Sequence, residues 1–156
     1  MQNQENTVEI LNDLVKVNND RIAGYERAIR EAKDLDVDLK ATFEGMVRES
    51  EEYRQELEGK VHECGGEVER GTTTSGKIYR AWMDVKATFT GSDRKAILSS
   101  CEFGEDAALR AYESAMHAEN ELSPDVRSLI SDQHSSLRTS HDLIKKYRDA
   151  QSAMDR

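Results

Sequence analysis

Residues 65–91 read GGEVERGTTTSGKIYRAWMDVKATFTG, and this stretch decides the fold. It begins with a glycine pair that ends the helical pattern before it, and Gly and Thr are frequent in its first half. Its second half predicts a short helix that stops at Gly91, because apolar residues recur there at helical spacing: Ile78, Trp82, Met83, Val85 and Phe89. A long connection that contains its own helix therefore separates the two halves of the chain.

Two longer segments precede this stretch, and in each of them apolar residues recur every three or four positions, which predicts amphipathic helices. The first helix is expected from about Glu5 to Glu31. The second follows a run of capping aspartates that ends at Asp38, and the glycine pair at Gly65 ends it. A short turn joins the two helices, so we expect an antiparallel hairpin.

Two more amphipathic segments follow the stretch, and both have start signals. Ser92 is the expected N-cap of a helix over about Asp93–Asn120. Ser123 then supplies a capping hydroxyl, and Pro124 stands in the first position of the last helix. That helix is expected to reach about Arg148, and a short turn again joins the pair into a hairpin.

Two hairpins joined by a long crossover have the connectivity of a ferritin-like four-helix bundle, whereas an up-down bundle has short turns throughout. The chain has 156 residues, which is enough for one domain with a sizeable core. We therefore predict an all-α, ferritin-like four-helix bundle, with a short extra helix in the crossover, as a single domain over residues 1–156.

Composition limits the partners of this domain. The formal net charge is −9, and an acidic surface repels phosphate backbones and anionic lipids, so neither nucleic acid nor a membrane is an expected partner. No segment has the roughly 18 apolar residues that a membrane span needs, and the polar first residues show no secretory signal. Cys64 and Cys101 have no close-spaced pairing and are expected to be reduced thiols of a cytoplasmic protein.

Each long helix interrupts its apolar stripe once near its middle, with Asn18, Ser50, Glu105 and Gln133. Polar side chains on a core face are costly unless they form hydrogen bonds, so we expect these four residues to share one network, a core polar layer. Glu105 is the only acid among them. Arg21, which lies near Asn18 on the same helix, is the partner that we expect for Glu105.

In di-iron and di-manganese bundles this layer holds a Glu from each of two helices and a Glu-x-x-His pair from each of the other two. An internal repeat allows that pattern to be compared: residues 22–29, IAGYERAI, match residues 109–116, LRAYESAM, in register. Chance similarity between two amphipathic helices is the alternative explanation. On this alignment Glu105 stands at an expected Glu position, and Asn18 stands at the other.

The two Glu-x-x-His pairs are also replaced. Ser50 and Tyr53 stand in one of them, and Gln133 and Ser136 stand in the other. Of six ligand positions, one keeps a strong donor. A dimetal oxidase or ferroxidase centre is therefore not expected, and we predict no cofactor.

A different ligand set is conceivable. Glu102 lies one helical turn before Glu105, and His141 lies on the inward face of the last helix, so these three could form an atypical mononuclear metal site. The alternative is that Glu102 is solvated and His141 is a satisfied core or rim histidine. Asp142, adjacent in sequence, is expected to point away from the His141 ring, and no catalytic motif is found.

One stretch carries a family resemblance: residues 101–108, CEFGEDAA, running into the AYE of residues 111–113. Three further stretches fit the same pattern: LNDL at 11–14, AWMDVK at 81–86 and HDLI at 141–144. With these motifs the chain resembles the small bacterial ferritin-like four-helix-bundle proteins of a domain-of-unknown-function family, over about residues 5–149. The resemblance implies a ferritin-like fold, a bacterial cytoplasmic setting and no established activity. Iron ligands do not carry over, because only Glu105 matches.

Two hypotheses of function follow. The first is a non-catalytic bundle that binds a protein partner or associates with itself, as a homodimer through a long helix face. The second is a metal-binding protein with an atypical site at Glu102, Glu105 and His141. One intact ligand position out of six favours the first hypothesis.

Overall fold

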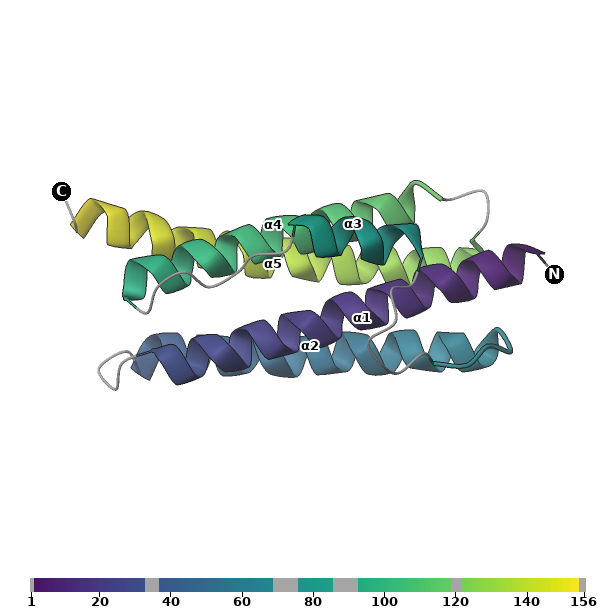
Figure 1. Ribbon diagram of the computed structural model, residues 1–156, viewed down its shortest axis with the longest axis horizontal. Coiled ribbons are helices and arrows are strands. Elements are labelled where there is room, and N and C mark those ends of the chain that lie inside the picture. Colours follow the sequence, from purple (N-terminus) through teal and green to yellow (C-terminus); the bar gives the residue numbers. More distant parts are fainter. Residues whose placement is uncertain (1, 33–36, 69–75, 86–92, 119–121, 155–156) are drawn as a thin grey trace.

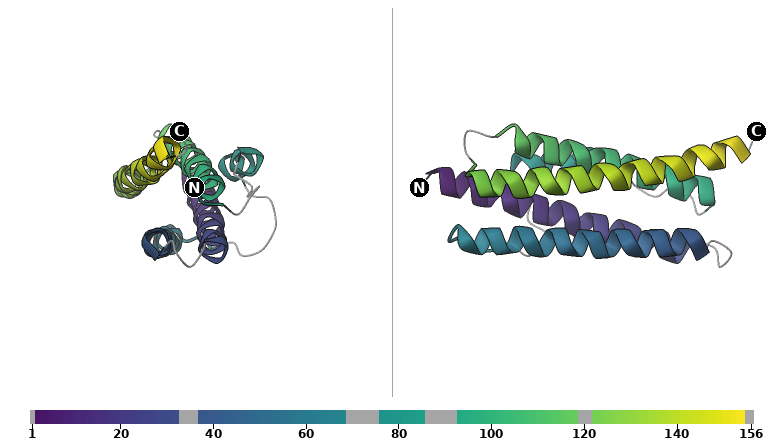
Figure 2. Two further views of the ribbon diagram at one scale, coloured as in Figure 1. Left: turned by 90° about the vertical axis from the view of Figure 1, so that its left-hand side faces the viewer. Right: turned by 180° about the vertical axis from the view of Figure 1, so that it is seen from behind.

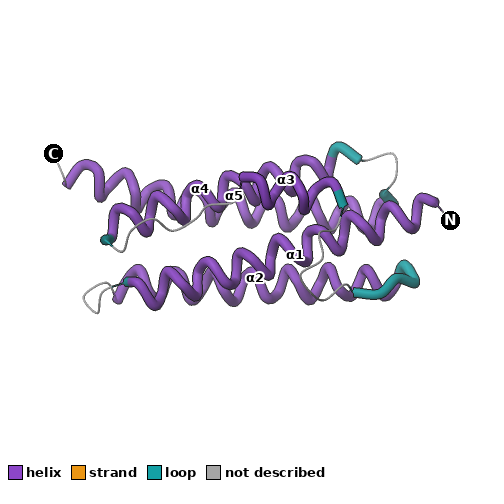
Figure 3. Tube along the Cα trace, viewed as in Figure 1, coloured by secondary structure: helices purple, strands orange, loops and turns teal. Residues whose placement is uncertain are grey.

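The computed structural model describes residues 2–32, 37–68, 76–85, 93–118 and 122–154 (Figure 1). These residues form five helices: α1 (Gln2–Glu31), α2 (Val37–Glu63), α3 (Lys77–Val85), α4 (Arg94–Met116) and α5 (Pro124–Met154). Within the described ranges there is no strand, as Figure 3 shows. The helices that can be described include none that is apolar enough over a sufficient length to cross a membrane. The predicted all-α class is confirmed.

The four long helices form two antiparallel pairs, α1 with α2 and α4 with α5, and α1 also packs against α4 (Figure 1). The end of α2 and the beginning of α4 lie at opposite ends of the bundle, so the crossover runs along its length. The short helix α3 belongs to this crossover and lies outside the four-helix arrangement, beside α1 and α4 (Figure 2). The predicted ferritin-like connectivity is confirmed.

Local sequence explains where the crossover begins and where the last connection ends. Gly65 adopts a positive φ of 77° just after α2, and the amide of Gly66 donates to the Val61 carbonyl at 2.9 Å. This is the Schellman arrangement that ends many helices, and glycine is favoured there because it has no Cβ to clash. At the start of α5, Pro124 stands in the first helical position, as the sequence predicted, and the Ser123 carbonyl accepts from the Arg127 amide at 2.9 Å. The predicted capping hydroxyl of Ser123 instead donates to Asp125 Oδ1 at 2.6 Å.

The prediction of Ser92 as the N-cap of α4 is wrong. The cap is Asp93, whose backbone is extended and whose side chain accepts from the Ala96 amide at 2.8 Å. Asp is as good an N-cap as Ser, and its charge is also favourable at the positive end of the helix. Ser92 itself lies outside the described residues.

Other boundaries differ by a few residues. α1 already begins at Gln2, and α5 continues to Met154, beyond the expected end. α4 ends at Met116, and the expected end at Asn120 lies outside the described residues, as do Phe89 and Gly91 of the predicted short helix.

The apolar core has two parts that lie in succession along the bundle. The larger part includes Leu14 and Val17 of α1 and Leu57 of α2, whereas the smaller part includes Tyr25 of α1 and Phe43 of α2. Between these levels each of the four long helices contributes buried polar side chains. This polar layer is the region where a functional site is expected.

Candidate functional site

The centre of the polar layer is a buried ion pair between α1 and α4. Arg21 donates from Nε to Glu105 Oε1 at 2.6 Å and from Nη2 to Glu105 Oε2 at 3.0 Å. Only 5% of Arg21 and 1% of Glu105 are exposed. Two parallel hydrogen bonds match the flat guanidinium to the flat carboxylate, which is the strongest geometry for such a pair. The predicted pairing of Arg21 with Glu105 is confirmed.

The same guanidinium also reaches α2. Its Nη1 donates to Ser50 Oγ at 2.6 Å, and its Nη2 donates to Glu49 Oε1 at 2.9 Å. Glu49 in turn accepts from the hydroxyl of Ser140 on α5, at 2.8 Å and 2.9 Å. One arginine therefore connects all four long helices through two carboxylates and two hydroxyls.

Aromatic rings enclose this ion pair. The Arg21 guanidinium carbon lies 5.5 Å from the centre of the Tyr25 ring and 6.0 Å from the centre of the Tyr53 ring. A cation over the face of an aromatic ring is attracted by the electrons of that face. The rings also exclude water, which strengthens the pairing of Arg21 with its carboxylates.

Asn18 and Gln133 belong to a second set of hydrogen bonds, which Tyr112 bridges. Asn18 Nδ2 donates to the Tyr112 hydroxyl at 2.9 Å, and that hydroxyl donates to Gln133 Oε1 at 2.7 Å. Gln133 Nε2 then reaches the Tyr53 carbonyl and Glu56 Oε1, each at 3.2 Å. The four residues expected in one network are thus all buried, but their contacts fall into two groups.

Burial and charge shift the ionisation of the groups in this layer. Burial opposes the charged form of Arg21, but Glu105 outweighs it, and the pKa of Arg21 stays well above its ordinary value. Burial, followed by the charge of Glu105, raises the pKa of Tyr25 and of the Cys101 thiol. The layer therefore keeps Arg21 charged and the neighbouring phenol and thiol neutral at physiological pH.

A dimetal centre, which a ferritin-like fold would suggest, does not fit these residues. Its position is filled by the guanidinium of Arg21, which occupies both carboxylates, Glu105 and Glu49. Asn18 and Gln133 offer only amide groups, and both nitrogens are already donors to neighbouring oxygens. A fixed positive charge and neutral amides are poor ligands for iron or manganese, which bind carboxylates and imidazoles.

A second cluster lies on the outer side of the α4–α5 contact. Glu102 and Asp106 of α4 face His141 of α5, and each of the three offers a ligand atom within 4.8 Å of the others. His141 Nε2 lies 2.5 Å from Asp106 Oδ1, and Glu102 contacts the guanidinium of Arg148. The structure thus brings Glu102 and His141 together, but with Asp106, while Glu105 belongs to the ion pair with Arg21.

The expectation that Asp142 points away from His141 is wrong. Its Oδ1 lies 3.1 Å from His141 Nδ1, so a carboxylate faces each ring nitrogen. Adjacent residues on a helix generally diverge. Here the Asp142 carboxylate turns back toward the His141 ring. Helical spacing alone does not predict this contact.

The short helix α3 is attached to α1 by two aspartates that sequence analysis did not single out. Asp13 accepts from the amides of Gly76 and Tyr79, at 2.9 Å and 3.2 Å. Asp20 accepts from the Tyr79 hydroxyl at 3.0 Å and from Trp82 Nε1 at 2.8 Å. Their spacing of seven residues, or two helical turns, is the signal that could have shown them.

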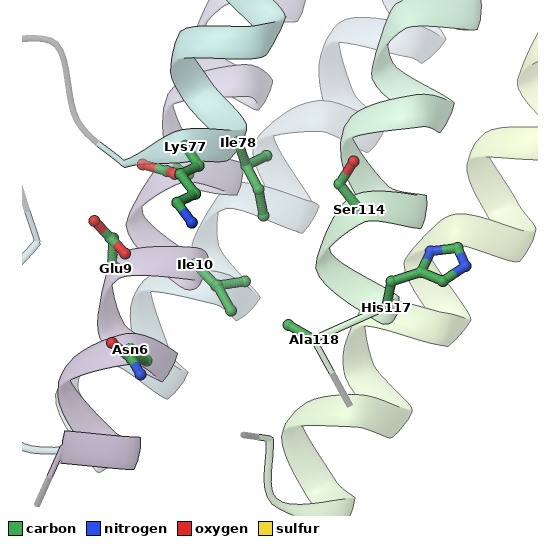
Figure 4. A pocket seen from close by; sticks show the side chains of 9 residues that line it. Asn6, Glu9, Ile10, Lys77, Ile78, Ser114, His117 and Ala118 are labelled. Atoms are coloured by element: carbon green, nitrogen blue, oxygen red, sulfur yellow. The ribbon is translucent and has the colours of Figure 1, made fainter. Parts of the chain in front are cut away.

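Beside this attachment, α1, α3 and α4 enclose an open pocket of about 570 Å³. Figure 4 shows Glu9 of α1 and Lys77 of α3 on one side of it and His117, just after α4, on the other. The ring of His117 is close to the carbonyl of Glu113, at 2.7 Å from Nδ1. The lining mixes charges of both signs with isoleucines, so it does not define one class of ligand.

Both cysteines are free thiols, as predicted, with Cys101 buried and Cys64 half-buried.

Comparisons with known proteins agree with this fold. A mutant of Dps1 from Mycobacterium smegmatis is 10% identical, with a TM-score of 0.80, over 94% of this chain and 97% of that one. The dodecameric thioferritin from Bacteroides fragilis is 13% identical, with a TM-score of 0.82, over 97% of this chain and 89% of that one. A ferritin-like, diiron-carboxylate protein from Bacillus anthracis is 15% identical, with a TM-score of 0.74, over 95% and 99%.

At identities this low, these likenesses show the fold and not the chemistry. No curated protein matches the chain in sequence. The family model described as "Domain of unknown function (DUF2383)" matches residues 6–118, which is most of the chain. The chain therefore belongs to the DUF2383 family, and its fold is that of the ferritin-like helical bundles.

Proposed function

We propose that this protein is a non-catalytic ferritin-like bundle that acts by binding another protein chain, and that a second copy of itself is its first partner. The observation that carries the proposal is the position of Arg21, which occupies the middle of the bundle with Glu49 and Glu105. Because an internal ion pair fills the centre of the bundle, the outer surface is the part that can bind a partner. The proposal takes residues 1–156 as one domain in the bacterial cytoplasm.

Apolar side chains on that surface support self-association. Phe103 of α4 is 52% exposed, and Leu143 of α5 is also exposed. Large aromatic side chains are enriched at protein interfaces because they bury much area at low entropic cost. The structural neighbour from Bacteroides fragilis is described as dodecameric, so the fold is compatible with assembly.

Sedimentation velocity over a range of concentrations tests this proposal. We expect a species heavier than the 17.7 kDa chain, with a population that rises with concentration. Phe103→Ser should shift the equilibrium toward the monomer, whereas Val37→Ser, which changes another exposed apolar residue at the start of α2, should not. A single monomeric species for the parent protein at all concentrations would overturn self-association.

A second candidate function is the binding of a divalent metal ion on the α4–α5 surface. The proximity of Glu102 and His141 favours it. Elemental analysis of protein purified without chelators is the test. The variant Glu105→Ala then distinguishes a site that includes Glu105 from a site on the outer α4–α5 surface. A site that includes Glu105 loses its metal in this variant, whereas a site on the outer surface keeps it.

A further inference from the structure

Three side chains between α4 and α5 have the composition of a metal site. Glu102 and Asp106 stand four residues apart, about one turn of α4, so both carboxylates are on the same face. His141 of α5 completes the group, and one ligand atom from each residue lies within 4.8 Å of the other two. All three are half-buried, so an ion from solvent can reach them.

The orientation of His141 suits a ligand. Its Nδ1 lies 3.1 Å from Asp142 Oδ1, and its Nε2 faces Asp106 at 2.5 Å. Histidines that bind metal ions generally donate their second ring N–H to a carboxylate, which fixes the tautomer and the direction of the ring. Asp142 would accept the Nδ1–H hydrogen bond while the Nε2 lone pair binds the ion, in place of the present contact between Nε2 and Asp106.

A cation already contacts one of these carboxylates. Arg148, about two turns after His141 on the same face of α5, pairs with Glu102 and also lies 3.3 Å from Asp149 Oδ1. An ion bound by Glu102 would replace this guanidinium, and Arg148 would keep Asp149 as a partner. Arg148 is therefore a competitor for the site and not one of its ligands.

We propose that Glu102, Asp106 and His141 bind one divalent first-row transition-metal ion, with Zn²⁺ preferred over Mn²⁺ and Mg²⁺. This inference rests on the second candidate function and makes it specific, and it is independent of self-association. One imidazole with two carboxylates suits Zn²⁺, whereas Mg²⁺ prefers oxygen ligands and retains its water. Three protein ligands leave a fourth position for a water molecule.

The geometry needs only small side-chain adjustments. Tetrahedral Zn²⁺ with bonds of roughly 2.0–2.2 Å holds its ligand atoms about 3.4 Å apart. The present separations range from 2.5 Å for His141 with Asp106 to no more than 4.8 Å within the group. Rotation of Glu102 away from Arg148 closes the longer distances, while the bound ion takes the place of the contact between Asp106 and His141.

The same surface contains a matched control. His134 of α5 faces Glu113 of α4, with 3.8 Å between Nε2 and Oε2. This pair joins the same two helices about two turns away and contains one imidazole and one carboxylate. It belongs to none of the clusters of three possible ligands found among the described residues. A general loss of helix pairing would therefore affect both positions, whereas loss of a metal site affects only the first.

Isothermal titration calorimetry of the full chain with zinc chloride tests the inference. We expect one ion per chain, and we expect His141→Gln and Glu102→Gln each to weaken binding by about tenfold or more. His134→Gln should bind like the parent protein. Arg148→Gln should bind more tightly because it removes the competing cation. Titrations with manganese and magnesium chlorides should give weaker affinity and no measurable binding, respectively.

The outcomes separate this inference from the function on which it rests. If zinc binds the parent and His141→Gln equally well, the proposed ligands are wrong although metal binding stands. If the parent binds no metal ion, this inference and the second candidate function both fail. The cluster then consists only of ion pairs between α4 and α5. Arg148→Gln keeps all three ligands, so a lack of tighter binding in that variant contradicts the role of Arg148 even if another variant does not fold.

Discussion

At the scale of single residues, the charge of Arg21 must be compensated inside the protein. Transfer of a guanidinium from water into a buried site is costly, and the carboxylates of Glu105 and Glu49 offset that cost. The pair with Glu105 is the more buried of the two, because 26% of the Glu49 side chain is exposed. Removal of the Glu105 charge should therefore leave Arg21 poorly compensated.

We expect Glu105→Gln to lower the free energy of unfolding by about 3–5 kcal/mol, because it breaks a buried ion pair and leaves the partner charged. Urea unfolding followed by circular dichroism measures this change. Glu52→Gln, at an exposed position of α2, removes the same charge without burial and should have little effect. Equal stabilities for the two variants would show that Arg21 does not depend on Glu105.

The two thiols should differ in reactivity. Burial, together with the charge of Glu105, raises the pKa of Cys101, so little of it is the reactive thiolate at neutral pH. Cys64 is half-buried, so a reagent can reach it, and it should react first with iodoacetamide. In Cys64→Ser protein, alkylation should require denaturant. Fast labelling of the native Cys64→Ser protein would mean that Cys101 is accessible.

At the scale of elements, α3 is held to α1 by hydrogen bonds as well as by the burial of Ile78 and Trp82 in the larger apolar core. Asp20 accepts two of the hydrogen bonds, from Tyr79 and Trp82, and the two groups also lie against the apolar core. Burial, followed by the charge of Asp20, raises the pKa of Tyr79 to about 12, so its hydroxyl remains a donor across the physiological range. The attachment should therefore be sensitive to a single change at Asp20.

Trp82 is the only tryptophan in the chain, so its fluorescence reports on α3. We expect Asp20→Ala to shift the emission to longer wavelength and to destabilise the attachment by about 1.5–3 kcal/mol, the typical contribution of a hydrogen bond to a charged group. Asp84→Ala, an exposed change within α3, is the control and should leave the emission unchanged. An unshifted spectrum for Asp20→Ala would show that packing alone holds this helix.

Much of this element-scale arrangement could be predicted from sequence, because helix starts, glycine stops and apolar spacing are local signals. The Gly65 stop and the Pro124 start are examples. Contacts between helices are less accessible, since they depend on how each helix is rotated against its neighbours. Sequence spacing therefore identified Glu105 and Arg21 but not Asp106 beside His141, and it did not show Tyr112 between Asn18 and Gln133.

At the scale of the whole molecule, the ion pair separates two apolar cores and joins all four long helices. A buried ion pair of this kind is not the most stabilising choice, since well-packed apolar residues often perform as well or better. We infer that its role here is to fix how the four long helices align, at the level of the bundle where a dimetal centre would lie. If this is correct, the two charges matter only as a pair.

A double-mutant cycle of unfolding free energies with Arg21→Leu and Glu105→Leu tests this central claim most directly. Each single change should cost about 3–5 kcal/mol, because it leaves the remaining charge without its most buried partner. The double variant should be about as stable as the parent protein, with the difference appearing as coupling energy between the two sites. A double variant that loses the sum of the two single effects would contradict the account, because Arg21 and Glu105 would then act independently.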